Sequence, residues 1–133
     1  MTNLRQYSDL PIRLAVGFHL IYGTVDNIIS WDRMLEFRDF LEHFDFPFPL
    51  TSAVISVYLQ FISGLLFIVG WKVRVVGVVM IANFIIAILM VHLNDAYPTI
   101  YPAISMLAGS IFLALNGSGT VSLDYHFETK KSN

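Results

Sequence analysis

Four long apolar runs fill most of this chain of 133 residues and constrain its fold more than any other feature. They extend over about Ile12–Ile29, Leu50–Trp71, Val73–Leu93 and Ile100–Leu115. An α-helix of about 20 apolar residues crosses the hydrocarbon core of a bilayer. A soluble domain of this size has too little interior to bury four such runs. The pattern therefore predicts an all-α integral membrane protein, an antiparallel four-helix bundle forming one domain over residues 1–133.

Composition narrows the possible functions. The chain is 56% hydrophobic and only 14% charged, whereas soluble domains carry about 25% charged residues. Its net charge of −2 offers no basic surface for nucleic acid. The absence of cysteine excludes a thiol redox pair and a thiolate-bound metal within the chain. The expected surroundings are a lipid bilayer and another membrane subunit or a second copy of the chain.

The basic residues indicate an orientation. If all four runs cross the membrane, six of the eight Lys and Arg residues fall on one side: Arg5, Arg13, Lys72, Arg74, Lys130 and Lys131. Basic residues favour the cytoplasmic side. Both termini are therefore predicted to be cytoplasmic, with the 30–49 connection outside. Arg13, near the inner edge, is expected to extend to lipid phosphates.

The 30–49 connection has a helical pattern of its own. From Asp32 to Phe44, the apolar residues Met34, Phe37 and Leu41 recur at helical spacing. This predicts a short amphipathic helix on the outer membrane surface. Two interpretations remain for it: a cap that closes the bundle, or a docking surface or lid over an outward-facing pocket.

Polar side chains within the apolar runs are the best functional signal. They are costly in hydrocarbon and usually face the interior of a bundle. A helical rise of about 1.5 Å per residue places most of them near the middle of the bilayer and the others near its outer edge. They are predicted to line an outward-opening, ligand-binding cleft. The middle layer comprises His19, Tyr22, Gln60 and Asn83, and the outer layer comprises Asp26 and His92, with Asp95 and Tyr97 beside them.

Each of these residues also has a structural interpretation. Gln60 and Asn83 would bond across helices, and His19 would be satisfied within the bundle. Asp26 would cap the outer end of its helix or pair with His92. Glycines within the runs are expected to allow close helix packing: Gly17, Gly23, Gly64, Gly77 and Gly109.

Metal chemistry has little support in the sequence. Two axial histidines must reach the same haem iron, but His19 and His92 differ in depth by about 17 Å on the helical-rise scale. No closely spaced His/Glu pair indicates a di-iron centre. No intrinsic metal or cofactor is therefore expected.

Several short motifs, in order along nearly the whole chain, resemble the DoxX family. They are Arg13–Gly17 followed by Tyr22-Gly23, Phe46–Pro49, Gln60–Gly70, Lys72–Arg74, His92, and Gly117-x-Gly119 followed by Ser122-Leu123-Asp124. Two departures stand out. The family often has Glu at the position of Gln60, and Lys at the position of Asp26 or Asn27. An amide does not relay a proton as a carboxylate does.

The resemblance implies a small bacterial or archaeal inner-membrane protein, often linked to quinone-dependent oxidoreductases. The first functional hypothesis is a subunit of such a complex, with quinone bound in the bundle and any redox group on a partner. The second is a non-catalytic structural or assembly subunit. A small transporter ranks third, because no internal repeat supports alternating access.

Overall fold

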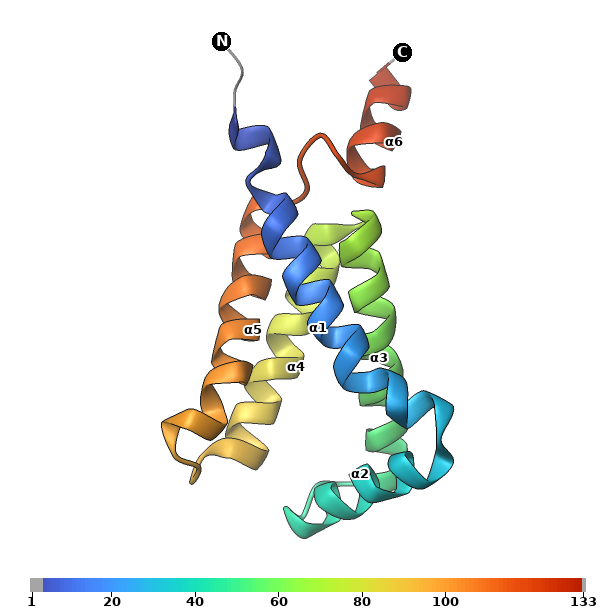
Figure 1. The fold of residues 1–133 in the computed structure, drawn as a ribbon, viewed down its shortest axis with the longest axis vertical. Coiled ribbons are helices and arrows are strands. Elements are labelled where there is room, and N and C mark those ends of the chain that lie inside the picture. Colours follow the sequence, from blue (N-terminus) through green and yellow to red (C-terminus); the bar gives the residue numbers. More distant parts are fainter. Residues whose placement is uncertain (1–3, 133) are drawn as a thin grey trace.

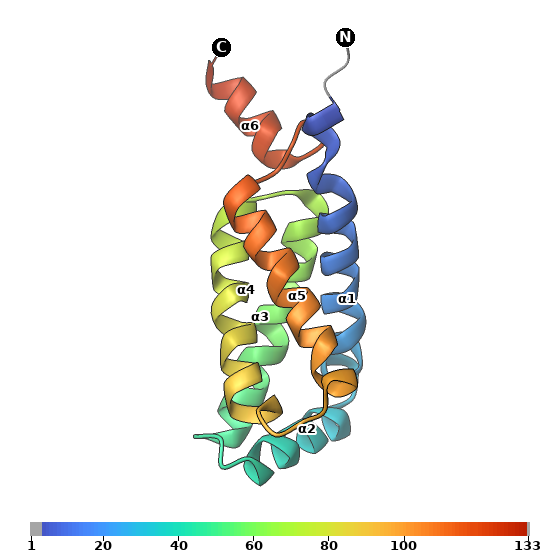
Figure 2. The ribbon, with the colours of Figure 1, turned by 90° about the vertical axis from the view of Figure 1, so that its left-hand side faces the viewer.

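The computed structural model describes residues 4–132, and every regular element in that range is helical. The α-helices are α1 (Asp9–Ile29), α2 (Trp31–His43), α3 (Pro49–Val69), α4 (Val73–Ala87), α5 (Tyr97–Asn116) and α6 (Leu123–Ser132). A 3-10 turn at Leu4–Tyr7 precedes α1, and a π-helical turn at Ile88–His92 extends α4. In Figures 1 and 2, α1, α3, α4 and α5 follow the long axis, with α2 at one end and α6 beyond the other.

Three helices in the described range are long and apolar enough to cross a membrane: Pro49–Val69, Val73–His92 and Tyr97–Asn116. They agree with three of the four predicted runs. The helix expected to be the first span, α1, is not among them. Its 21 residues include Asp9, Arg13 and Asp26, and such charged residues lower the hydropathy of the segment.

Local sequence explains where the helices end. Ser30 is extended between α1 and α2, and its Oγ accepts a hydrogen bond from the backbone N–H of Arg33. This cap starts α2 and confirms the helix predicted in the first long connection. Gly70 ends α3 with φ of 78°, and Lys72 follows with φ of 52°. Two left-handed residues close together make the tight turn into α4.

The long helices pack as two close pairs, α1 with α3 and α4 with α5. Gly17 and Gly64 bring the first pair together, because a Cβ on either would lie 2.8 Å from the other's carbonyl oxygen. Gly77 allows the second pair to approach in the same way, because a Cβ on Gly77 would lie 2.8 Å from the backbone nitrogen of Ala114. Gly23 was expected to serve packing as well, but a Cβ there would meet nothing within 4 Å.

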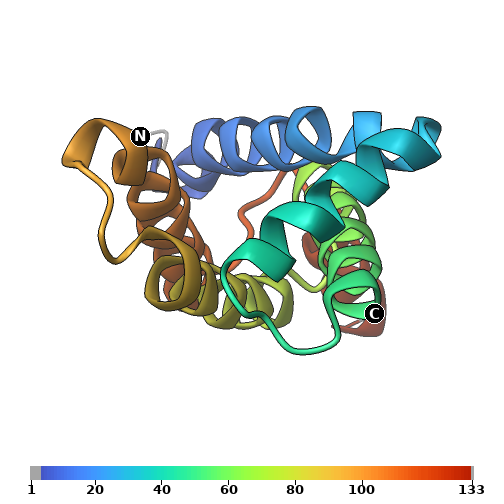
Figure 3. The ribbon, with the colours of Figure 1, turned by 90° about the horizontal axis from the view of Figure 1, so that it is seen from below.

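Two apolar clusters hold the ends of this arrangement. The first joins the four long helices near the α3–α4 turn and contains Val16, Leu20, Phe67, Val73, Val76, Met80, Phe84 and Leu113. The second lies under α2 and contains Met34, Leu41, Ala53, Val57 and Val91. Figure 3 shows α2 crossing the end of the molecule. The packing of α2 supports its interpretation as a cap.

Candidate functional site

A cavity of about 740 Å³ lies between the two helix pairs. This volume is within the range of about 300–1,000 Å³ that small-molecule sites occupy. Its wall is mostly apolar and includes Phe37, Phe40 and Leu41 of α2. Helix α2 therefore forms part of the cavity wall at the end where the sequence predicts an outward opening.

Four of the six predicted site residues line this one cavity. His19 comes from α1, Gln60 from α3, Asn83 from α4 and His92 from the π-helical turn. π-helical turns add one residue to a helix and are frequent at functional sites. Side chains that are far apart in the sequence thus place hydrogen-bonding groups around a common apolar space.

Several of these side chains have donors or acceptors that are not used in hydrogen bonds within the described part of the protein. Gln60 Nε2 donates to Ser56 Oγ of its own helix at 2.9 Å. Neither His19 nor Asn83 makes a side-chain hydrogen bond with any residue in the described range 4–132. The expectation that Gln60 and Asn83 bond across helices is therefore not met.

His92 is held by a different acid from the one expected. Its Nδ1 lies 2.9 Å from Asp95 Oδ2, and both side chains are partly buried. Of the two structural roles suggested for Asp26, the pairing with His92 is wrong, because His92 pairs with Asp95, three residues further along the same segment. Within residues 4–132, no group of three His, Asp or Glu side chains is placed to hold a metal ion.

The structure does not bring Tyr22 and Asp26 into the cavity. Tyr22 is 71% exposed and stacks on Phe18 with ring centroids 5.9 Å apart. Asp26 is exposed near the end of α1. Tyr22 and Asp26 lie on the same broad face of α1 as His19. The close contact between Gly17 and α3 fixes the rotation of α1, and in that rotation His19 lines the cavity while Tyr22 and Asp26 do not.

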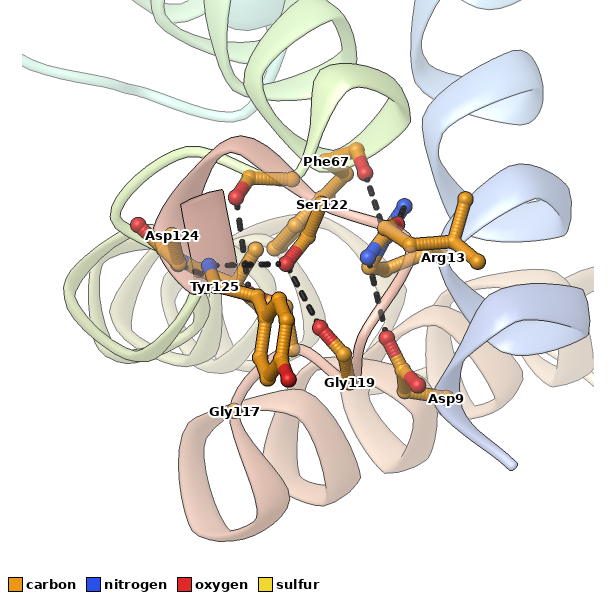
Figure 4. Close-up of polar contacts among 12 residues, drawn as sticks. Asp9, Arg13, Phe67, Gly117, Gly119, Ser122, Asp124 and Tyr125 are labelled. Atoms are coloured by element: carbon orange, nitrogen blue, oxygen red, sulfur yellow. Dashed lines mark hydrogen bonds and ion pairs between the residues drawn. The ribbon is translucent and has the colours of Figure 1, made fainter. Parts of the chain in front are cut away.

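A second polar site, at the α3–α4 turn end, was not predicted (Figure 4). Arg13 is 1% exposed and forms an ion pair with the equally buried Asp9 at 3.0 Å. Its Nε donates to the Phe67 carbonyl at 2.9 Å, and its Nη2 donates to the Val121 carbonyl at 2.9 Å. The expectation that Arg13 extends to lipid phosphates is therefore wrong.

The neighbouring carboxylate of Asp124 caps the start of α4. Its Oδ1 accepts the N–H of Lys72 at 2.6 Å, and its Oδ2 accepts the N–H of Val73 at 3.0 Å. Ser118 Oγ donates to the same carboxylate at 2.8 Å. A carboxylate at a helix N-terminus satisfies free N–H groups and complements the helix dipole.

Only part of this second site had a signal in the sequence. Asp9 and Arg13 are four residues apart, the spacing of ion pairs on one helix face. The Ser122-Leu123-Asp124 motif was noted only as a resemblance. Nothing local connects Arg13 to the carbonyl of Val121, which lies 108 residues further along the chain.

Comparison with known proteins covers the part of the chain that builds most of the cavity. The sequence model of the DoxX family matches residues 8–93, from just before α1 to just after the π-helical turn. No curated protein and no solved structure matches the chain. The family match extends over more than half of the 133 residues. The chain therefore belongs to the DoxX family, a family of small membrane proteins.

Proposed function

We propose that the cavity binds a quinone or a similar ligand with a carbonyl-bearing head group and an apolar tail. One observation carries the proposal: polar side chains from three helices and the π-helical turn surround a single apolar cavity. His19 and Asn83 are available as donors, because neither has a hydrogen-bond partner within residues 4–132. Neutral or charged histidine and asparagine amides both donate to carbonyl oxygens.

In the cell, this protein would be a small subunit of a quinone-linked oxidoreductase in the cytoplasmic membrane. Membership of the DoxX family supports this role, because some members are linked to quinone processes. The cavity would orient the quinone, and a flavin, metal or thiol centre would reside on a partner. His92, held by Asp95, is a further hydrogen-bonding side chain in the cavity wall.

Removing the two free donors tests ligand binding. We expect His19→Phe combined with Asn83→Leu to weaken binding of a short-tailed benzoquinone by about 10- to 100-fold. Two hydrogen bonds of about 1 kcal/mol each correspond to a loss of this size. Binding is measured by titration calorimetry of the detergent-solubilised protein.

Tyr22→Phe is the matched control for the donor test. It also removes a polar group from the middle of α1, but that hydroxyl lies outside the cavity lining. We expect its affinity for the quinone to equal that of the wild type. Wild-type affinity in the His19→Phe/Asn83→Leu protein would reject the binding proposal and leave a structural or assembly role as the better account.

The proposed topology adds α1 as a fourth span to the three apolar helices. Its 21 residues extend about 30 Å at 1.5 Å per residue, and it packs along α3. Its charged residues lie toward its ends: Asp9 and Arg13 near one, and Asp26 near the other. The result is an antiparallel four-helix bundle with both termini in the cytoplasm.

Reporter fusions test this topology. We expect reporters at the N-terminus and after residue 133 to be cytoplasmic, and a reporter in the connection between α2 and α3 to be external. The basic residues near the two termini and in the α3–α4 turn provide the bias. If the N-terminal reporter and the reporter between α2 and α3 are both external, α1 does not cross the membrane. In that case only α3, α4 and α5 span it, and the C-terminus is still cytoplasmic.

A further inference from the structure

Aliphatic side chains of α3 and α4 form one part of the cavity wall. The residues of this α3–α4 rim both line the cavity and are exposed: Ile55, Leu59, Val78, Ala82 and Ile86. Ile55 is 60% exposed and Val78 is 59% exposed. No polar side chain is among the five.

The packing of the helices leaves room for an opening at this rim. The close pairs are α1 with α3 and α4 with α5, so α3 and α4 meet more loosely along their length. Both helices are long and apolar enough to cross a membrane. The α3–α4 rim therefore faces hydrocarbon rather than water when these helices lie in a bilayer.

Other routes out of the cavity suit an apolar chain less well. At the α2 end, Phe37, Phe40 and Leu41 form part of the cavity wall, so a chain leaving there would have to pass these three side chains. The opposite end is filled by the cluster around Phe67 and Met80, both fully buried. On the α1 side the exposed wall includes the polar His19.

We infer that the α3–α4 rim is a side portal through which a lipid-soluble ligand enters from the bilayer and where its long apolar tail remains. The head group lies inside, beside His19 and Asn83, while the tail leaves between α3 and α4. This inference rests on the proposed quinone binding and names its ligand class: a membrane-dissolved molecule with a polyisoprenoid or similar tail.

Blocking the rim while leaving the head-group site intact tests the portal. We expect Val78→Trp combined with Ala82→Trp to weaken binding of a quinone with a long polyisoprenoid tail by about tenfold or more, because the tail loses its apolar contacts. Binding of the same head group bearing only a methyl substituent should stay within about twofold of the wild type, because this ligand has no tail that contacts the rim. Both ligands are titrated into protein in lipid nanodiscs.

A matched substitution on the same helix is available. Val75 is 62% exposed, nearly the same as Val78, but it does not line the cavity. Val75→Trp should leave the affinities for both quinones unchanged, which shows that bulk on the outer face of α4 is not itself harmful. Its thermal unfolding also serves as the reference for the folding of the double variant.

The outcomes separate this inference from the proposal on which it rests. Selective loss of the long-tailed ligand supports the portal. Unchanged binding of both ligands in the double variant overturns it, and so does equal loss of both, because the bulk would then act at the head group. If the wild-type protein binds neither quinone, the proposed function itself fails.

Discussion

Replacing Arg13 with methionine is expected to destabilise the protein by about 3–5 kcal/mol, the cost of breaking a buried ion pair from one side. The substitution leaves the carboxylate of Asp9, which is 1% exposed, without its cation. It also removes the donor to the carbonyls of Phe67 and Val121. Thermal unfolding in detergent measures the loss, and limited proteolysis should cut the segment after α5 sooner.

Arg33→Met is the control for Arg13→Met. Arg33 pairs with Glu36 at 3.1 Å, but the two side chains are 61% and 66% exposed. Exposed ion pairs contribute about 0–1 kcal/mol, so this variant should unfold close to the wild-type temperature. Equal effects of the two substitutions would contradict the structural role assigned to the buried pair.

Gly64→Ala is expected to lower the stability by about 1–3 kcal/mol, the usual cost of overpacking. The new Cβ would lie 2.8 Å from the carbonyl oxygen of Gly17 and 3.1 Å from the Cβ of Leu20, atoms that move only with the backbone of α1. The α1–α3 pair would therefore have to separate. Thermal unfolding in the same detergent measures this loss.

Gly23→Ala, the same substitution on α1, is the control for Gly64→Ala and should not lower the stability. A Cβ there meets nothing within 4 Å, and alanine in a helix is favoured over glycine by up to about 1 kcal/mol. Its stability should equal or exceed that of the wild type. A Gly64→Ala protein as stable as the Gly23→Ala protein would show that α1 and α3 do not depend on this close approach.

The apolar runs predicted most of the helices because burial or lipid contact must continue along the whole length of a span. The end of the first run at Ile29 matched the end of α1, where Ser30 becomes extended. The second run was predicted to reach Trp71, but α3 ends at Val69 because Gly70 adopts a left-handed conformation. Helix α6 was not predicted, since its polar sequence has no apolar stripe of comparable strength.

The sequence predicted the candidate site only as far as the depth of a residue in the membrane determines whether it lines the cavity. Residues at similar depths on different helices, such as Gln60 and Asn83, do line a common cavity. Depth does not determine how far each helix is rotated, so Tyr22 was placed with His19 although only His19 reaches the cavity. That rotation follows from the contact between Gly17 and Gly64, which links two distant parts of the chain.

The cap that Asp124 places on α4 has a consequence for biosynthesis. A ribosome completes α3 and the turn that follows it some fifty residues before it adds the carboxylate that binds the N–H groups of Lys72 and Val73. Chains fold from the N-terminus as they emerge. The turn between α3 and α4 therefore lacks its carboxylate cap throughout the translation of α5.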